Sequence, residues 1–153
     1  MGVTEKLAEL GLTLPPVVPP VASSVPAVRS GDHVFTSGQL PMVDGALTAT
    51  GKVGAEVSAE DATAAARVCA LNALAAIDAL VGIDSVVRIV KVVGFVASAP
   101  GFTGQPGVIN GTSNLLGELF GDAGIHARSA VGVAELPLGA AVEVEMIVEV
   151  APA

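Results

Sequence analysis

The C-terminal stretch of the chain alternates between apolar and acidic residues, and this alternation restricts the fold more than any other feature. Side chains two residues apart in a β-strand share one face of the sheet. One face of the last strand therefore carries Val142, Val144, Met146, Val148 and Val150. The other face carries Glu143, Glu145, Ile147 and Glu149. A strand of this kind belongs to a sheet that has a hydrophobic layer on one side only.

The strand before it, expected over residues 127–136, is predicted to form a hairpin with the last strand, residues 141–150, through a turn at residues 138–139. The period of two then places Val131 and Val133 under the same hydrophobic layer. Arg128 lies on the opposite face together with small residues, Ala130, Gly132 and Ala134. Alanine and glycine on a face that carries a cation indicate that another molecule approaches closely there.

This hairpin also predicts how far apart two charged candidates lie. Arg128 would face approximately Glu149, and Glu143 would lie some six residues further along the sheet. At about 3.3 Å per residue this is roughly 20 Å, which is too far for one small ligand to touch both groups. A site that uses both Arg128 and Glu143 must then lie between two subunits.

The rest of the chain predicts a single α/β (α+β) domain, residues 25–153, after an N-terminal helix and proline-rich extension over residues 1–24. Ser58 is a suitable N-cap for a long helix that stops at Gly82. A strand–helix–strand order implies parallel pairing, so we expect a mixed sheet with two helices on one face. The expected helices cover residues 4–12, 58–80 and 108–120, and the other expected strands cover residues 27–29, 33–37, 46–47 and 86–98.

The composition is unusually apolar, with 52% hydrophobic and 14% charged residues and a mean hydropathy of +0.71. The longest helical apolar stretch, residues 62–81, contains Arg67, Asn72 and Asp78, which argues against a membrane-spanning helix. The N-terminus lacks the pattern of a signal peptide, so we expect a cytoplasmic protein without a membrane partner. Apolar surface covered by further copies of the chain explains the composition, and oligomerisation is therefore expected.

Charge and residue types exclude several functions. The net charge is −8, with seven Lys and Arg residues, no Trp, no Tyr and four Phe, which argues against nucleic-acid binding. The single cysteine, Cys69, is interpreted as a small buried residue, and an intrachain disulfide is excluded. The histidines His33 and His126 are far apart and have no ligand spacing, so no metal or other cofactor is expected. His126, just before the Arg128 strand, is a candidate for a polar contact.

Two short motifs resemble one known family. Residues 34–41, Val-Phe-Thr-Ser-Gly-Gln-Leu-Pro, are similar to the second strand and following loop of the reactive intermediate deaminases (Rid, or YjgF, family). Residues 127–131, Ala-Arg-Ser-Ala-Val, followed by Leu-Pro at 136–137 and Val-Glu-Val-Glu at 142–145, are similar to its C-terminal signature. The resemblance extends from about residue 25 to residue 150. It implies a chorismate-mutase-like fold and a homotrimeric barrel with clefts between subunits.

The resemblance also implies an activity, the hydrolysis of enamines and imines such as 2-aminoacrylate to 2-keto acids and ammonia. It implies that Arg128 binds the substrate carboxylate, for which a guanidinium offers paired donors. Glu143 would orient or deprotonate the attacking water. Backbone groups near Ser37, Gly38 and Ser129 would contact the ligand, and Asn110 resembles a family asparagine near the cleft.

The chain departs from the family at its N-terminus and leaves alternatives open. A family tyrosine before the first strand has no counterpart, since Ser24 falls about there and the chain has no tyrosine. Arg128 can instead form a salt bridge with a neighbouring subunit, and Glu143 can be a solvated strand residue. The whole cleft can serve a non-catalytic or regulatory carboxylate-binding protein. Endoribonuclease activity, attached by name to some relatives, conflicts with the acidic charge and the missing aromatic residues.

Overall fold

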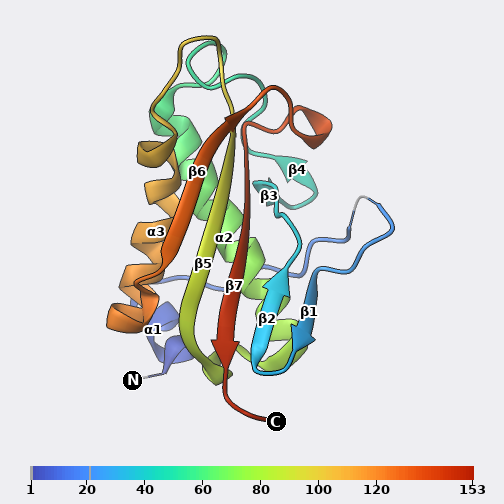
Figure 1. Cartoon of the computed structure of the whole chain (residues 1–153), viewed down its shortest axis with the longest axis vertical. Coiled ribbons are helices and arrows are strands. Elements are labelled where there is room, and N and C mark those ends of the chain that lie inside the picture. Colours follow the sequence, from blue (N-terminus) through green and yellow to red (C-terminus); the bar gives the residue numbers. More distant parts are fainter. Residues whose placement is uncertain (1, 21) are drawn as a thin grey trace.

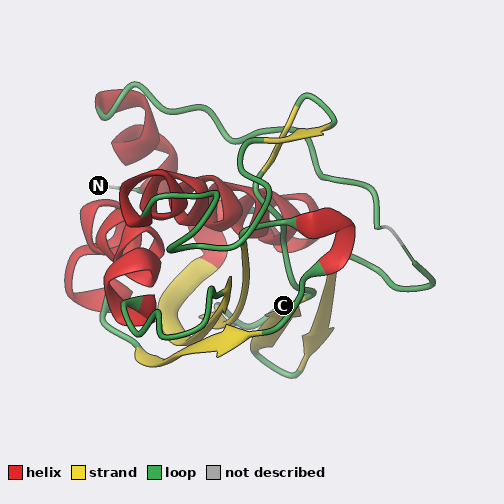
Figure 2. Ribbon diagram, turned by 90° about the horizontal axis from the view of Figure 1, so that it is seen from above, coloured by secondary structure: helices red, strands yellow, loops and turns green. Residues whose placement is uncertain are grey.

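The computed structural model describes residues 2–20 and 22–153. A five-stranded mixed sheet in the order β1-β2-β7-β5-β6 is covered by helices on one face, as Figures 1 and 2 show. The helices are α1 (Val3–Glu9), α2 (Ala59–Val81) and α3 (Gln105–Phe120), with short 3-10 turns η1 (Ile83–Ser85), η2 (Gly121–Gly124) and η3 (Pro137–Gly139). The strands are β1 (Ala27–Ser30), β2 (His33–Thr36), β3 (Met42–Val43), β4 (Ala46–Leu47), β5 (Val86–Ala97), β6 (Ala127–Val133) and β7 (Val142–Val150).

The predicted long helices are confirmed, with one difference at the start of α3. The Ser58 hydroxyl accepts a hydrogen bond from the Asp61 amide and so caps α2, which ends before Gly82 at φ +83°. Helix α3 begins at Gln105, three residues before the predicted start at residue 108. Pro106 lies in its first turn, where a backbone N–H has no partner inside the helix, so the proline does not prevent helix formation.

The predicted N-terminal hairpin and the expected short edge strand are also confirmed. Strands β1 and β2 pair antiparallel around a turn at Gly31 and Asp32. The expected edge strand at residues 46–47 is β4, and its partner is β3. The residues between them, Asp44 and Gly45, have φ values of +51° and +81°. Two positive φ values in a two-residue turn match the right-handed twist of the flanking strands.

The predicted hairpin between the last two strands is wrong. Strand β5 lies between them, with β6 parallel and β7 antiparallel to it. Arg128 is level with Val92 and Met146, not with Glu149. The strands β6 and β7 are two strand spacings apart, about 10 Å in total. The connection between them, residues 134–141, is long enough to span this distance, so the two strands need not be neighbours.

The predicted faces are correct for β7 and wrong for β6. All five apolar residues of β7 named above are at most 1% exposed. Val131, predicted to be buried, is 43% exposed on the uncovered face. Ala130 instead packs against the core, and a Cβ at Gly132 would lie 2.9 Å from Gln105 Nε2 of α3. Small residues on β6 face the helices because α3 approaches this edge strand closely.

Helices α2 and α3 pack closely at Gly111, and this contact predicts a large loss of stability. A Cβ at Gly111 would clash with the Thr63 carbonyl oxygen in the backbone of α2. Gly111→Ala should therefore destabilise the fold by about 1–3 kcal/mol, although alanine is the better helix former. In Gly117→Ala, on the same helix, the new Cβ has no neighbour within 4 Å. The free energy of unfolding of that variant should rise by about 0.5–1 kcal/mol, because alanine is a better helix former than glycine. Thermal unfolding of both variants tests the packing, and equal midpoints would contradict it.

Helix α1 is attached to the domain through Asp84 in η1. The Thr4 amide and hydroxyl donate to Asp84 Oδ1 at 3.0 Å and Oδ2 at 2.8 Å. Val3 and Leu7 of α1 are buried in the core that α2, α3 and the sheet share. Asp84 therefore supplies the cap that Gly2, the N-cap residue of α1, cannot provide.

The cap predicts a pH dependence for the attachment of α1. The hydrogen bonds from Thr4 lower the pKa of Asp84, so folding favours its ionised form. The contribution of ionised Asp84 to the stability of the fold is present above the ordinary aspartate pKa and is lost as the pH falls through the lowered pKa. Asp84→Ala should increase hydrogen exchange of the α1 amides at neutral pH, whereas Asp122→Ala in η2 should not. Equal exchange in both variants would contradict the role of the cap.

Helix α2 is long and apolar enough to cross a bilayer by length and composition. Its most apolar window is 56% buried inside the fold, and the helix packs against β7 and α3. This is the position of a core helix.

Candidate functional site

Arg128 lies on the edge strand β6 and turns its side chain toward helix α3. Its Nη1 donates to Asn110 Oδ1 at 2.8 Å and to Ser113 Oγ at 3.2 Å. Asn110 and Ser113 are three residues apart, so they lie on the same side of the helix. The structure therefore brings together two of the predicted site residues, Arg128 and Asn110. Within the described chain, Arg128 forms no ion pair.

Two further polar groups, on His126 and Gly124, continue this arrangement. His126 Nε2 lies 2.9 Å from Ser113 Oγ, and His126 Nδ1 lies 2.6 Å from the carbonyl oxygen of Gly124. The polar contact expected for His126 is thus present. Ser113 was not predicted from the sequence, although its spacing of three residues from Asn110 on a helix is a signal that points to it.

Glu143 forms a second group with the loop after β2. Gln39 exchanges two backbone hydrogen bonds with Val144, at 2.8 and 3.0 Å, which holds this loop against the start of β7. A Cβ at Gly38 would clash with the Glu143 carboxylate, so glycine leaves room for this carboxylate beside the loop. Ser37 donates its hydroxyl to the Val25 carbonyl at 2.5 Å, and the hydroxyl oxygen can still accept a hydrogen bond. Ser37, Gly38 and Glu143 are therefore neighbours.

The environment of Glu143 favours a role as a base. Burial, and secondarily the negative charge of Glu145, raise the pKa of the Glu143 carboxyl above its ordinary value. A carboxylate with a raised pKa holds a proton more strongly and is a better general base near neutral pH. Among the described residues, no hydrogen-bond donor reaches this carboxylate.

The two groups of residues do not meet within one chain. Arg128 is level with Val92 of β5, and Glu143 is level with Phe95. Two strand spacings of about 4.8 Å and three residues of about 3.3 Å separate their Cα atoms by roughly 14 Å. Arg128 also faces the helices, whereas Glu143 lies on the uncovered face of the sheet. The predicted hairpin placed Arg128 and Glu143 roughly 20 Å apart on one face. In the structure they are closer along the sheet but lie on opposite faces, so they remain separated within one chain.

Ser129 is the remaining predicted site residue. It follows Arg128 on β6 and is level with Val93 and Glu145, so its side chain lies on the uncovered face. Because β6 is an edge strand, one side of its backbone has no neighbouring strand in the described chain. A backbone contact from Ser129 to a ligand is compatible with this position.

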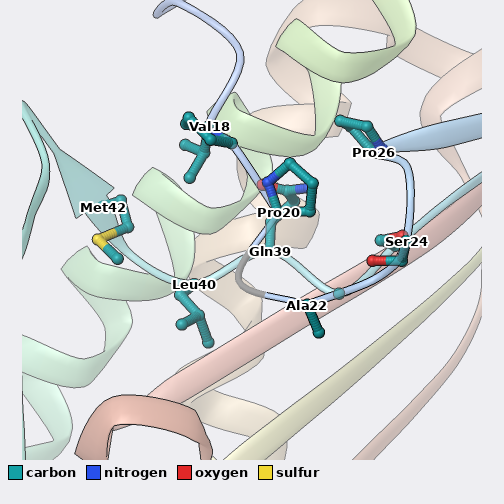
Figure 3. A pocket seen from close by; sticks show the side chains of 11 residues that line it. Val18, Pro20, Ala22, Ser24, Pro26, Gln39, Leu40 and Met42 are labelled. Carbon is teal, nitrogen blue, oxygen red and sulfur yellow. The ribbon is translucent and has the colours of Figure 1, made fainter.

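A small cavity of about 90 Å³ lies beside Ser37 and Gly38. Figure 3 shows that Val18, Pro20, Ala22 and Ser24 of the N-terminal extension lie around it, together with Leu40 and Met42 from the loop after β2. The extension is thus adjacent to the Glu143 group. Ser24, at the position expected for the family tyrosine, also lines this cavity.

Cys69 does not supply a nucleophile. It is fully buried, and burial, followed by the charge of Glu143, raises the pKa of its thiol well above the ordinary value. No group of three or more His, Cys, Asp or Glu side chains within residues 2–20 and 22–153 is placed to hold a metal ion.

Comparisons with known proteins define the family. Residues 4–150 match the family described as "YjgF/chorismate mutase-like, putative endoribonuclease". Protein TCP17 of Trypanosoma cruzi is 45% identical over 149 residues, which cover 96% of this chain and 93% of TCP17. The chain therefore belongs to the YjgF/chorismate-mutase-like family.

Solved structures have the same architecture. The protein Atu1372 of Agrobacterium tumefaciens, of unknown function, is 45% identical with a TM-score of 0.87, covering 97% of this chain and 91% of its own. A Shewanella oneidensis protein, also described as a putative endoribonuclease, is 29% identical with a TM-score of 0.94, covering 98% of this chain and all (100%) of its own. The family and the chorismate-mutase-like fold expected from the sequence are confirmed.

Proposed function

We propose that the chain hydrolyses reactive enamines and imines that carry a carboxylate, such as 2-aminoacrylate and its imine tautomer, in clefts between the subunits of a cytoplasmic homotrimer. Membership of the YjgF family supports the proposal, because the resemblance described above implies enamine and imine hydrolysis. The observation that carries the proposal is the Arg128 guanidinium, which Asn110 holds through a single nitrogen. Among residues 2–20 and 22–153, no acceptor is placed on Nε or Nη2 of Arg128, so these N–H groups remain for a substrate carboxylate.

Arg128 supplies binding and orientation. A guanidinium can donate two parallel hydrogen bonds to one carboxylate, which fixes the plane of the substrate and the position of its imine carbon. Imine hydrolysis is intrinsically fast, so placing the substrate and a water molecule contributes more than a strong nucleophile does.

Glu143 supplies the base. Water adds to the imine carbon while its proton passes to the Glu143 carboxylate, and the proton then moves to the nitrogen. Loss of ammonia from the resulting carbinolamine leaves the 2-keto acid. Ser37, Gly38 and the Ser129 backbone contact the substrate in this arrangement.

The separation of Arg128 and Glu143 and the uncovered face of the sheet support an intersubunit position for the site. Val28, Phe35 and Val131 on β1, β2 and β6 are 52%, 43% and 43% exposed. Apolar side chains spread across a sheet favour burial against further copies of the chain. Arg128 of one subunit and Glu143 of the next can then face one ligand.

The test is the release of pyruvate from 2-aminoacrylate that a dehydratase generates from serine. The wild-type chain should accelerate this release, and light scattering should give the mass of a trimer. No acceleration at micromolar protein would overturn the enzymatic proposal. If pyruvate still binds in that case, a non-catalytic carboxylate-binding protein is supported. A monomeric mass would overturn the intersubunit site.

A further inference from the structure

The Ser113 hydroxyl lies between the Arg128 guanidinium and the His126 ring. The side chains come from three places in the fold, since Ser113 belongs to α3, Arg128 to β6 and His126 to the connection between η2 and β6. The distances are 3.2 Å from Arg128 Nη1 to Ser113 Oγ and 2.9 Å from Ser113 Oγ to His126 Nε2. The imine chemistry described above does not use Ser113 or His126.

The hydrogen bonds of this group have one consistent direction for a neutral ring. The Gly124 carbonyl oxygen can only accept, so His126 Nδ1 carries the proton and donates to it at 2.6 Å. His126 Nε2 is then an acceptor, and the Ser113 hydroxyl donates to it. The lone pairs of Ser113 Oγ are left for Arg128, whose guanidinium has only donors.

This direction determines which edge of Arg128 is presented to solvent. Asn110 Oδ1 and Ser113 Oγ both accept from Nη1 and so restrict rotation of the guanidinium. In the described part of the chain no acceptor is placed on Nε or Nη2. These two nitrogens form one edge of the guanidinium, which matches the two oxygens of a carboxylate.

We propose that Ser113 and His126 are positioning residues that hold the Arg128 guanidinium with its Nε–Nη2 edge directed at the substrate carboxylate. His126 acts through Ser113 because its hydrogen bond fixes the serine rotamer and leaves the serine oxygen to accept from Arg128. The inference rests on the proposed carboxylate-binding role of Arg128 and adds two residues that set its geometry.

The experiment compares pyruvate binding by calorimetry with imine hydrolysis in the wild-type chain and in Ser113→Ala. Loss of one acceptor from a charged donor should weaken pyruvate binding and raise KM about tenfold, with kcat within about twofold. Ser113→Thr keeps the hydroxyl and should restore most of the affinity. His126→Phe keeps the ring shape without its nitrogens and should behave like Ser113→Ala. Asn114→Ala, on the same helix, and His33→Asn are matched controls that should bind as the wild type does.

A double-mutant comparison separates positioning from a general effect on folding. In the Arg128→Ala background, Ser113→Ala should cause no further loss of pyruvate affinity, because the group that it positions is gone. Equal affinity of wild type and Ser113→Ala, or an additive loss in the double variant, would overturn the inference. A wild-type chain that binds pyruvate without hydrolysing imines refutes only the enzymatic proposal. A wild-type chain that binds no carboxylate overturns the inference as well.

Discussion

Replacement of Arg128 by alanine should lower kcat/KM for imine hydrolysis about 100-fold or more. The variant loses the proposed charge-assisted, two-point contact with the substrate carboxylate, and each hydrogen bond to a charged group contributes about 1.5–3 kcal/mol. Arg128→Lys keeps the positive charge but not the planar pair of donors, so it should recover only part of the loss. The measurement is the initial rate of pyruvate release across a range of 2-aminoacrylate supply.

Arg67 provides the control for Arg128. It lies on α2 and pairs at the surface with Glu118 of α3 at 3.3 Å. Arg67→Ala removes an arginine and a surface ion pair without touching the candidate site, and exposed pairs contribute little to stability. Its kcat/KM should equal that of the wild type. If Arg67→Ala and Arg128→Ala lose activity equally, the loss reflects the fold and not the carboxylate contact.

Replacement of Glu143 by glutamine should lower kcat about 100-fold or more, since an amide has nearly the same shape but cannot accept the proton of the attacking water. Glu149→Gln, further along the same face of β7, is the matched control and should leave kcat unchanged. Retention of full activity in Glu143→Gln would show that another group activates the water.

The raised pKa of Glu143 predicts how the activity of the wild-type chain depends on pH. In the wild type, activity should fall as the pH drops through the raised pKa, so the acid limb lies at a higher pH than the ordinary glutamate pKa would give. Glu145→Gln removes a repelling negative charge, lowers the pKa of Glu143 and should move the acid limb to lower pH. An acid limb that stays in place in Glu145→Gln would contradict this assignment.

The same shift determines the effect on stability. A raised folded-state pKa means that the neutral carboxyl is favoured in the fold. The contribution of this neutral carboxyl to stability is complete below the pKa of Glu143 in the unfolded chain. It is lost as the pH rises through the pKa of Glu143 in the folded chain. At neutral pH, Glu143→Gln should therefore unfold at the same or a higher denaturant concentration than the wild type. A loss of activity without a loss of stability separates chemistry from folding.

Local patterns in the sequence were sufficient to predict most elements of this fold, because each depends on nearby residues. The Ser58 cap, the Gly82 stop and the valine-rich run that forms β5 determine their own structure. Strand order depends instead on which distant segments pair. The alternation in β7 identified its buried face but contained no information that β5 would be its neighbour.

The candidate site was predictable only in part for the same reason. The motifs containing Gly38, Arg128 and Glu143 were recognisable along the sequence. The side of the sheet that Arg128 faces depends on how closely α3 approaches β6, and Ser113 reaches Arg128 only through that contact. Residues that owe their role to packing between helix and strand have no motif of their own.

The position of β5 between β6 and β7 has a consequence for how such a site can diverge. Arg128 and Glu143 are carried by two strands that hydrogen-bond to the same backbone, so their offset along the sheet is set by one shared reference. Changes of length or composition in the N-terminal extension or in the loop after β2 leave that offset intact. In the proposed site, substrate preference can therefore be altered from the rim of the cleft, while the offset between the anion clamp and the water-activating group within each subunit is fixed by the strand that lies between them.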